Sequence, residues 1–317
     1  MNDGSRSGAA KSSATMRGTL LVLVSAAAFG GLPIFAKLAY SEGVNLKTLL
    51  TFRFTIAAAI VWLLWAVQVG RGERISWRDV RMGIIPLVAL GAIGYVGQSF
   101  SYFSAVNIIS ATATSLLLYT YPIIVVILSR IFLKEQLTRQ KLFALVLAAT
   151  GAMLVLGLGS AILSPSGSAL GNLEPSGVAW ALAASLIYSA YIVVGARHTA
   201  SVSPIYSSAV IISSAALIYT LWSILSGELQ IGVSPMGLVW AIGLALISTV
   251  VAISTFFAGL RWVGPSRAAI ISTLEPTVTV FLAALILQEN ITFEQIAGGV
   301  LILAAVIVLQ FQRKSKA

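Results

Sequence analysis

The sequence contains no cysteine and a single histidine, His198. The lack of cysteine excludes disulfide bonds, thiolate nucleophiles and cysteine metal sites, and one histidine cannot form a multi-histidine metal cluster. Charged residues are also scarce, at 9% of the 317 residues, whereas a soluble domain carries roughly a quarter. So few charges cannot cover a surface that faces water, and we therefore expect an integral membrane protein.

Apolar residues are abundant instead, at 58% of the chain, and the mean hydropathy is +0.96. A run of about 20 mainly apolar residues can cross a bilayer as a helix. The first such run is too long for the apolar core of a signal peptide, which spans about 7–15 residues. The sequence predicts an all-α integral membrane fold with ten transmembrane helices, at 18–40, 47–69, 81–104, 108–132, 139–159, 177–196, 204–226, 236–259, 266–288 and 293–311.

The net charge is +10, from 20 basic and 10 acidic residues, and the basic residues lie mostly on one side of the predicted spans. The three exceptions are Lys37, Lys47 and Arg53. Cytoplasmic loops carry an excess of lysine and arginine, so both chain termini are expected in the cytoplasm. The basic residues form no single patch, and we expect no nucleic-acid partner.

Part of the sequence occurs twice, 154 positions apart: Pro122, Leu133, Glu135 and Thr138 match Pro276, Leu287, Glu289 and Thr292. Internal repeats indicate repeated structural units. Ten spans in two halves give five each, and because five is odd the halves must run in opposite directions. Inverted repeats are typical of transporters that bind near the middle of the membrane. The predicted division is a disordered tail 1–17, a first repeat 18–159, a linker 160–176, a second repeat 177–312 and a tail 313–317.

The runs from Leu116 to Thr138 and from Ile270 to Thr292, with Gly298 and Gly299 after the second, carry a family likeness. They resemble the EamA repeat of the drug/metabolite transporter superfamily, and the likeness covers nearly the whole chain as two copies. This resemblance implies a ten-helix carrier of small polar metabolites, commonly an exporter. By length and architecture the chain is most similar to YddG-type amino-acid exporters.

These observations predict a secondary transporter in the inner cell membrane that exports amino acids, aromatic ones included, by alternating access. A carrier for a nucleoside, sugar, cofactor or drug, a channel and a lipid scramblase stay open as alternatives. The chain has no phosphate-binding loop, and apart from Glu275 its spans lack the clustered acids and histidines of an enzyme. We expect no cofactor, no catalytic residue and no metal, with the bilayer and a small substrate as partners of a monomer or weak dimer.

Glu275 lies near the middle of the ninth predicted span, and the repeat aligns it with Tyr121. An ionisable group at that depth is costly and usually faces a polar cavity. We therefore expect Glu275 to bind a substrate amine or to carry a coupling proton. The alternative is a hydrogen bond between helices beside Pro276, which frees a backbone carbonyl.

Further polar and aromatic residues are candidates to line the cavity. The third span places Gly91, Tyr95, Gln98 and Tyr102 on one face of a regular helix. Packing through the glycines is the alternative, and Tyr102 also suits an aromatic belt at the membrane surface. The residues predicted to bind substrate are Glu275, Gln98, Tyr95, Tyr102, Tyr119, Tyr188, Ser185 and Phe29.

Three prolines lie inside predicted spans: Pro33, Pro122 and Pro276. Proline interrupts the hydrogen bonding of a helix and kinks it. We predict hinges for gating at these positions, with static kinks as the alternative.

Other charged residues are expected to have structural roles. Lys37 and Arg53 lie near the outer ends of their spans, where long basic side chains can reach the membrane surface; attraction of an anionic substrate is the alternative. Glu135 and Glu289 lie at predicted helix ends, and Thr292 to Gln295 fits a capping box.

Overall fold

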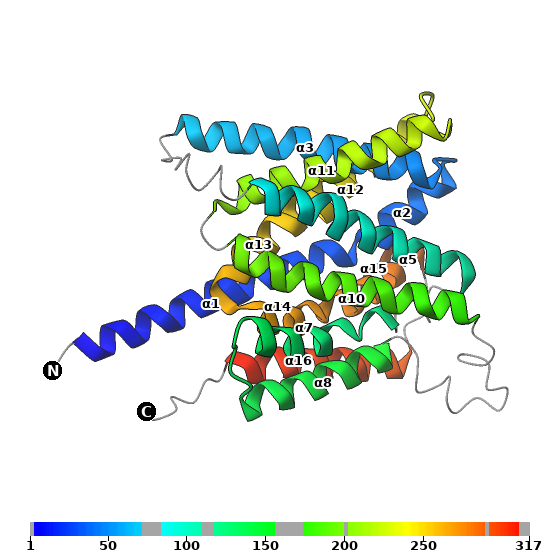
Figure 1. Cartoon of the computed structure of the whole chain (residues 1–317). Coiled ribbons are helices and arrows are strands. Elements are labelled where there is room, and N and C mark those ends of the chain that lie inside the picture. Colours follow the sequence, from blue (N-terminus) through cyan, green and yellow to red (C-terminus); the bar gives the residue numbers. More distant parts are fainter. Residues whose placement is uncertain are drawn as a thin grey trace.

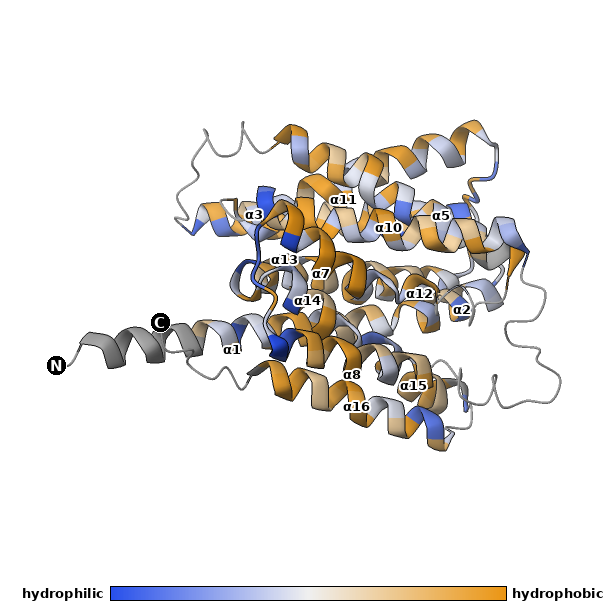
Figure 2. Ribbon diagram, turned by 60° about the horizontal axis from the view of Figure 1, so that its bottom comes forward, coloured by the Kyte–Doolittle hydropathy of each residue, from blue (hydrophilic) through white to orange (hydrophobic). Residues whose placement is uncertain are grey.

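The computed structural model describes residues 3–71, 84–109, 114, 117–155, 174–199, 202–288 and 292–310, and every regular element in these ranges is a helix (Figure 1). The predicted all-α class is therefore confirmed. Seven of the described helical segments are long and apolar enough to cross a membrane, and Tyr121–Phe132 and Phe293–Leu309 are shorter apolar helices. Apolar residues dominate these helices along their length (Figure 2). The chain is a multi-pass membrane protein.

The helices of the N-terminal half overlap the predicted spans, and one of them begins well before its span. They are α1 (Asp3–Gly30), α2 (Leu32–Ser41), α3 (Leu46–Gly70), the π-helix η1 (Leu90–Tyr95), α5 (Val96–Ile108), α7 (Tyr121–Phe132) and α8 (Arg139–Val155). Those of the C-terminal half are α10 (Pro175–His198), α11 (Pro204–Leu225), α12 (Pro235–Ala245), the π-helix η2 (Leu246–Val251), α13 (Ala252–Val263), α14 (Pro265–Ser272), α15 (Leu274–Leu287) and α16 (Phe293–Gln310).

Helix α1 begins much earlier than the sequence predicts. Residues 3–17 are helical, although the prediction was a disordered tail up to Arg17. Extending an existing helix adds one hydrogen bond for each residue fixed, and alanine, methionine, lysine and arginine are good helix formers. Because the membrane span already supplies the nucleus, the preceding segment continues it.

Local sequence explains where the helices of the C-terminal half begin. Proline has no backbone N–H and its fixed φ suits the first turn of a helix. The prolines at these starts are Pro175, Pro204, Pro235 and Pro265. A side-chain cap adds to this at α12, where the Ser234 hydroxyl accepts from Gly237 N at 2.9 Å. In the N-terminal half the Asn45 carboxamide oxygen caps α3 in the same way, accepting from Thr48 N at 2.8 Å.

The main helix contacts join the two halves of the chain. Helix α8 packs against α16, α3 against α11, α1 against α13 and α5 against α10. Where α8 meets α16, a Cβ at Gly151 would lie 2.7 Å from the Gly298 carbonyl oxygen, and one at Gly298 would lie 2.5 Å from the Gly151 oxygen. Gly18 and Gly259 make a similar approach between α1 and α13. Small residues allow this close packing, which drives helix association in lipid.

Three spans are interrupted beside the predicted hinge prolines. A turn at Tyr119–Thr120 precedes α7, and Thr273 separates α14 from α15, so helices restart next to Pro122 and Pro276. Gly31 likewise separates α1 from α2, whose first turn contains Pro33. The matched breaks before Pro122 and Pro276 occur at corresponding positions of the repeat. Movement at these breaks stays a prediction.

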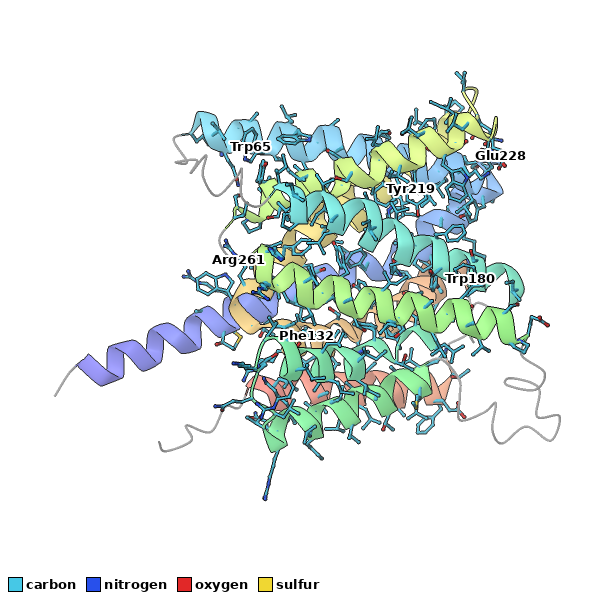
Figure 3. The ribbon with its side chains drawn as sticks, in the orientation of Figure 1. Trp65, Phe132, Trp180, Tyr219, Glu228 and Arg261 are labelled. Atoms are coloured by element: carbon cyan, nitrogen blue, oxygen red, sulfur yellow. The ribbon has the colours of Figure 1, made fainter. Side chains whose placement is uncertain are left out.

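Two groups of hydrogen bonds tie loops together. In the first, which we call the Glu228 clamp, Lys47 Nζ lies 2.5 Å from Glu228 Oε1 and Asn45 Nδ2 donates to the Glu228 carbonyl at 2.7 Å. In the second, the Glu135 clamp, the Glu135 carboxylate bonds Lys141 Nζ at 2.5 Å and Ser266 Oγ at 2.6 Å. Figure 3 shows Glu228 at one end of the helices and Arg261, a few residues before Ser266, at the other.

Candidate functional site

Arg53 is the most deeply placed basic residue of the candidate site. Its side chain is only 3% exposed, so the prediction that it reaches the membrane surface is wrong. Its Nε donates to Thr249 Oγ1 at 2.8 Å, and its Nη2 donates to Tyr95 Oη at 3.0 Å and to the Ser248 carbonyl at 3.3 Å. A buried cation must find such partners because water is absent there.

The partners of Arg53 belong to the two π-helices. Tyr95 is the last residue of η1, and Ser248 and Thr249 lie inside η2. The third span is therefore not a regular α-helix here, because a π-helix takes one residue more per hydrogen-bonded turn and shifts the following residues around the axis. A shared face for Gly91, Tyr95, Gln98 and Tyr102 stays a prediction. Gly91 within η1 does serve close packing, since a Cβ there would lie 2.3 Å from the Ile211 carbonyl oxygen.

Glu275 lies in the first turn of α15, just after the break at Thr273. The residue is partly buried, and the Tyr119 hydroxyl lies close to its carboxylate. The Arg53 guanidinium acts on this carboxylate electrostatically but forms no ion pair within 4.0 Å with it in the described part of the chain. A carboxylate at a helix N-terminus is stabilised by the helix dipole.

Five tyrosines form a continuous group, which we call the tyrosine array: Tyr95, Tyr119, Tyr121, Tyr188 and Tyr191. Ring centroids are 5.9 Å apart for Tyr119 and Tyr121, 4.8 Å for Tyr121 and Tyr188, 6.1 Å for Tyr188 and Tyr191, and 5.7 Å for Tyr191 and Tyr95. The Glu275 carboxylate is within electrostatic range of four of them, all except Tyr191. The array thus joins the acidic residue to the π-helix η1.

The array continues as a row of aromatic rings toward α11. The Phe54 ring lies 5.4 Å from that of Tyr95 and is stacked at 5.4 Å on that of Tyr219. Figure 3 labels Tyr219 on α11, the helix that leads toward the end of the molecule where Glu228 lies. Aromatic side chains thus reach from the centre of the bundle to the helix that supports the Glu228 clamp.

Ser185 joins α10 to the break before α7. Its hydroxyl lies 2.9 Å from Thr120 Oγ1, and Ser189 Oγ donates to the carbonyl oxygens of Ser185 at 2.7 Å and of Tyr121 at 3.3 Å. Ser185 is fully buried. The Thr120 hydroxyl in turn donates to the Leu117 carbonyl at 2.7 Å, just before the break, so Ser185 supports the shape of the site.

Gln98 and Tyr102 follow η1 on α5, and both are partly exposed. Tyr102 lies within electrostatic range of the Tyr119 hydroxyl, which places it beside the array. Gln98 Oε1 accepts from the adjacent Ser99 hydroxyl at 3.5 Å, a weak contact. The structure therefore brings Tyr102 near the site more clearly than Gln98.

Phe29 and Pro33 flank the break between α1 and α2. Two carbonyl oxygens at this break accept from side chains of the C-terminal half: Ala28 from Ser248 Oγ at 2.7 Å, and Gly30 from Thr279 Oγ1 at 2.9 Å. Phe29 packs against the main core, and Pro33 is exposed. The α1–α2 break is thus bonded both to η2 and to the helix that carries Glu275.

Sequence reasoning did not identify Ser248 and Thr249, expected Arg53 at the membrane surface, and left Tyr191 out of the residues predicted to bind substrate. The sequence does indicate a buried role for Arg53, because a basic residue within an apolar span is a candidate site residue for the same reason as Glu275. Tyr191 shares a helix face with Tyr188. Nothing in the run Leu246–Val251 marks it as a π-helix.

The repeated acidic residues have the structural surroundings predicted for them, as far as they are described. Glu135 belongs to its clamp, and the Thr292 N–H donates to Gln295 Oε1 at 2.8 Å while Gln295 N donates to Thr292 Oγ1 at 3.3 Å. This is the predicted capping box. Glu289 lies outside the described residues. Across the described part of the chain, no group of three or more acidic, histidine or cysteine side chains could hold a metal ion.

A multi-pass helical bundle with charged and polar groups in its interior is typical of membrane transport proteins. The profile of the EamA-like transporter family matches residues 16–157 and again residues 175–311. The chain therefore belongs to the EamA-like transporter family.

Individual relatives agree with this assignment. The chain is 24% identical to the uncharacterized transporter YcbK of Bacillus subtilis, over 89% of this chain and 88% of that protein. It is 27% identical to an uncharacterized transporter of Archaeoglobus fulgidus, over 92% of this chain and 99% of that protein. A solved crystal structure with 20% identity superimposes with a TM-score of 0.73, covering 94% of this chain and 97% of the other, and this similarity shows the fold.

Proposed function

We propose that the chain is a secondary transporter that exports amino acids, aromatic ones included, by alternating access at a site between its two halves. The observation that carries this proposal is the Glu275 carboxylate just after a helix break, close to Tyr119 and bordered by the tyrosine array. A carboxylate can bind the ammonium group of an amino acid, and tyrosine rings can pack against an aromatic side chain and attract a cation.

The proposal includes ten spans in two inverted repeats, 18–159 and 177–312, with both termini cytoplasmic. Two loop contacts support the count. The Glu228 clamp joins the loop after the first predicted span to the loop after the seventh, and the Glu135 clamp joins the loop after the fourth to the loop after the eighth. In a ten-span chain each of these pairs lies on one side of the membrane, and one missed span between the two loops of a pair would separate them.

The proposed substrate site consists of Glu275, Tyr119, Tyr188, Tyr95 and Tyr102, with Gln98, Ser185 and Phe29 around it. Glu275 binds the substrate amine or exchanges it for a proton, and the breaks beside Pro33, Pro122 and Pro276 act as hinges. Carbonyl groups at the breaks beside Pro33 and Pro122 support this role, because side chains of the opposite half bind them. A shift of one half relative to the other would therefore stretch or break these hydrogen bonds.

Counterflow in proteoliposomes tests the proposal. Vesicles containing the purified chain are loaded with unlabelled L-phenylalanine, and uptake of labelled L-phenylalanine is measured, with other amino acids, nucleosides and sugars as competitors. We expect saturable counterflow in which amino acids compete. Glu275→Gln should reduce the rate at least about tenfold, because it removes the charge that binds an ammonium group.

Glu174→Gln is the matched control, since Glu174 is an exposed carboxylate that precedes the first turn of α10 and is not part of the proposed site. It should retain the wild-type rate. Competition by nucleosides or sugars but no amino acid would overturn the amino-acid assignment and leave a carrier of another metabolite. Flux that does not saturate would identify a channel. Wild-type pH dependence of the flux in Glu275→Gln would exclude Glu275 as the proton carrier.

A further inference from the structure

The two π-helices occur at corresponding places in the two halves. Leu90–Tyr95 and Leu246–Val251 are 156 positions apart, within two residues of the spacing that relates the repeats. Insertion of a π-turn into an α-helix is rare and is found mostly at functional sites. Its appearance in both halves at matching positions indicates a shared role.

A π-turn loosens the hydrogen bonding of its helix and makes backbone and side-chain groups available. In η2 the Thr249 hydroxyl donates to the Leu244 carbonyl at 3.1 Å and accepts from Arg53 Nε. The Ser248 carbonyl accepts from Arg53 Nη2, which also donates to the Tyr95 hydroxyl at the end of η1. One guanidinium therefore bonds both π-helices.

The charge of Arg53 makes this connection strong. Its guanidinium carbon lies 4.9 Å from the centre of the Phe54 ring and 6.0 Å from that of the Tyr95 ring, so aromatic faces cover part of the cation. A buried cation that loses a hydrogen-bond partner bears the cost of its desolvation. If one π-helix moved alone, Arg53 would lose a hydrogen-bond acceptor, which is costly for a buried cation. Movement of both π-helices together keeps these hydrogen bonds.

The same network reaches the proposed substrate site from both sides. The Tyr95 ring is part of the tyrosine array. The Ser248 hydroxyl bonds the Ala28 carbonyl at the α1–α2 break, next to Phe29. A displacement of the array at one half can thus be transmitted through Tyr95, Arg53 and Ser248 to the break in α1.

We propose that Arg53 is a positioning residue that couples the two π-helices, so that η1 and η2 rearrange together when access alternates. Arg53 acts through its partners rather than by binding substrate. This inference rests on the proposed transport function for its purpose, but the coupling itself is a property of the chain without substrate.

Hydrogen–deuterium exchange of the full chain in lipid nanodiscs, without substrate, tests the coupling. Thr249→Val removes the acceptor of Arg53 Nε in η2, and Tyr95→Phe removes an acceptor of Nη2 in η1. We expect each substitution to accelerate exchange in the other π-helix by about threefold to tenfold, the range expected for one hydrogen bond within a membrane protein. Arg53→Lys keeps the charge but lacks the forked donors, and should accelerate exchange in both.

Thr255→Val is the matched control, because the Thr255 hydroxyl of α13 donates to the Val251 carbonyl at the end of η2, a bond to the same π-helix that does not involve Arg53. It should leave η1 unchanged. Faster exchange confined to the π-helix that carries the substitution would overturn the proposal.

The counterflow assay with L-phenylalanine separates this proposal from the transport function. Thr249→Val should lower the maximal rate several-fold and leave the half-saturating concentration unchanged, whereas loss of a substrate contact would raise that concentration and contradict a positioning role. If the wild-type chain shows no counterflow with any metabolite, the transport function fails, while the exchange result still decides whether Arg53 couples the π-helices.

Discussion

Thr279 donates a hydrogen bond of 2.9 Å to the carbonyl oxygen of Gly30, and the two residues belong to opposite halves of the chain. Thr279 lies one turn after Glu275 on α15, and its hydroxyl also donates to the Glu275 carbonyl at 3.1 Å. The break in α1 is therefore connected directly to the helix that carries the acidic residue. Local stability at the break should depend on this one hydroxyl.

Thr279→Val should loosen the start of α2. Valine has a similar shape but cannot donate, so the Gly30 carbonyl loses its partner at little change in packing. We expect the amides of residues 32–36 to exchange about threefold to tenfold faster, as measured by hydrogen–deuterium exchange. Thr279→Ser keeps a hydroxyl and should restore slow exchange; equal exchange in all three proteins would contradict the assigned bond.

Gly298→Ala should destabilise the fold at the crossing of α8 and α16. A Cβ at this position would lie 2.5 Å from the Gly151 carbonyl oxygen and 2.7 Å from Val155 N, and the backbone must move to relieve both contacts. Overpacking of this kind costs about 1–3 kcal/mol, which a thermal unfolding assay in detergent can detect. At Gly97 a Cβ would meet only Ile187 at 3.8 Å, and Gly97→Ala should retain the wild-type unfolding temperature or raise it.

Asn45 has two separable roles in the Glu228 clamp. Its carboxamide oxygen caps α3, and its Nδ2 donates to the Glu228 carbonyl. Asn45→Asp keeps the cap and loses the donor, whereas Asn45→Ala loses both, and a lost cap costs about 1 kcal/mol. Thermal unfolding should therefore rank wild type above Asn45→Asp and Asn45→Asp above Asn45→Ala. An alanine variant as stable as the aspartate variant would show that the cap contributes nothing.

The ion pair of the Glu135 clamp should show strong coupling between its two members. Lys141 and Glu135 side chains are 11% and 20% exposed, so removal of either partner leaves a charge with little access to water. Glu135→Gln should lower the free energy of unfolding by about 1.5–3 kcal/mol. The double variant Glu135→Gln/Lys141→Met should recover part of this loss, because it leaves no unpaired charge. Additive losses in the double-mutant cycle would contradict the pairing.

Hydrophobic runs and turn residues predict most of the helix boundaries. The span predicted at 47–69 is observed as α3, Leu46–Gly70, and that at 204–226 as α11, Pro204–Leu225. Both are bounded by residues with a clear physical preference, Asn45 as a cap and Pro204 at the first turn. Length and composition are sufficient for such segments because lipid requires every backbone group to bond within its own helix.

The interior of the site is less predictable from the sequence. Glu275 and most of the tyrosines could be identified from their depth and spacing, and the structure gathers Tyr119, Tyr121 and Tyr188 around that acid. The role of Arg53 could not, because it depends on two π-helices whose sequences contain no distinctive pattern. Tertiary packing at Gly91 and the bonds of Arg53, rather than local preference, hold η1 and η2 in that conformation.

Tyr121 and Glu275 occupy matching first turns of α7 and α15, the helices that restart beside Pro122 and Pro276. The first turn of each helix carries the partial positive charge of the helix dipole. Among the described residues of these two turns, only α15 has a carboxylate there. In a cycle in which the halves exchange roles, chemically identical halves would give two end states of equal energy. In the proposed transport cycle, Glu275 is one of the differences between the halves that would remove this equality and give the empty carrier a preferred resting state, open to one side of the membrane.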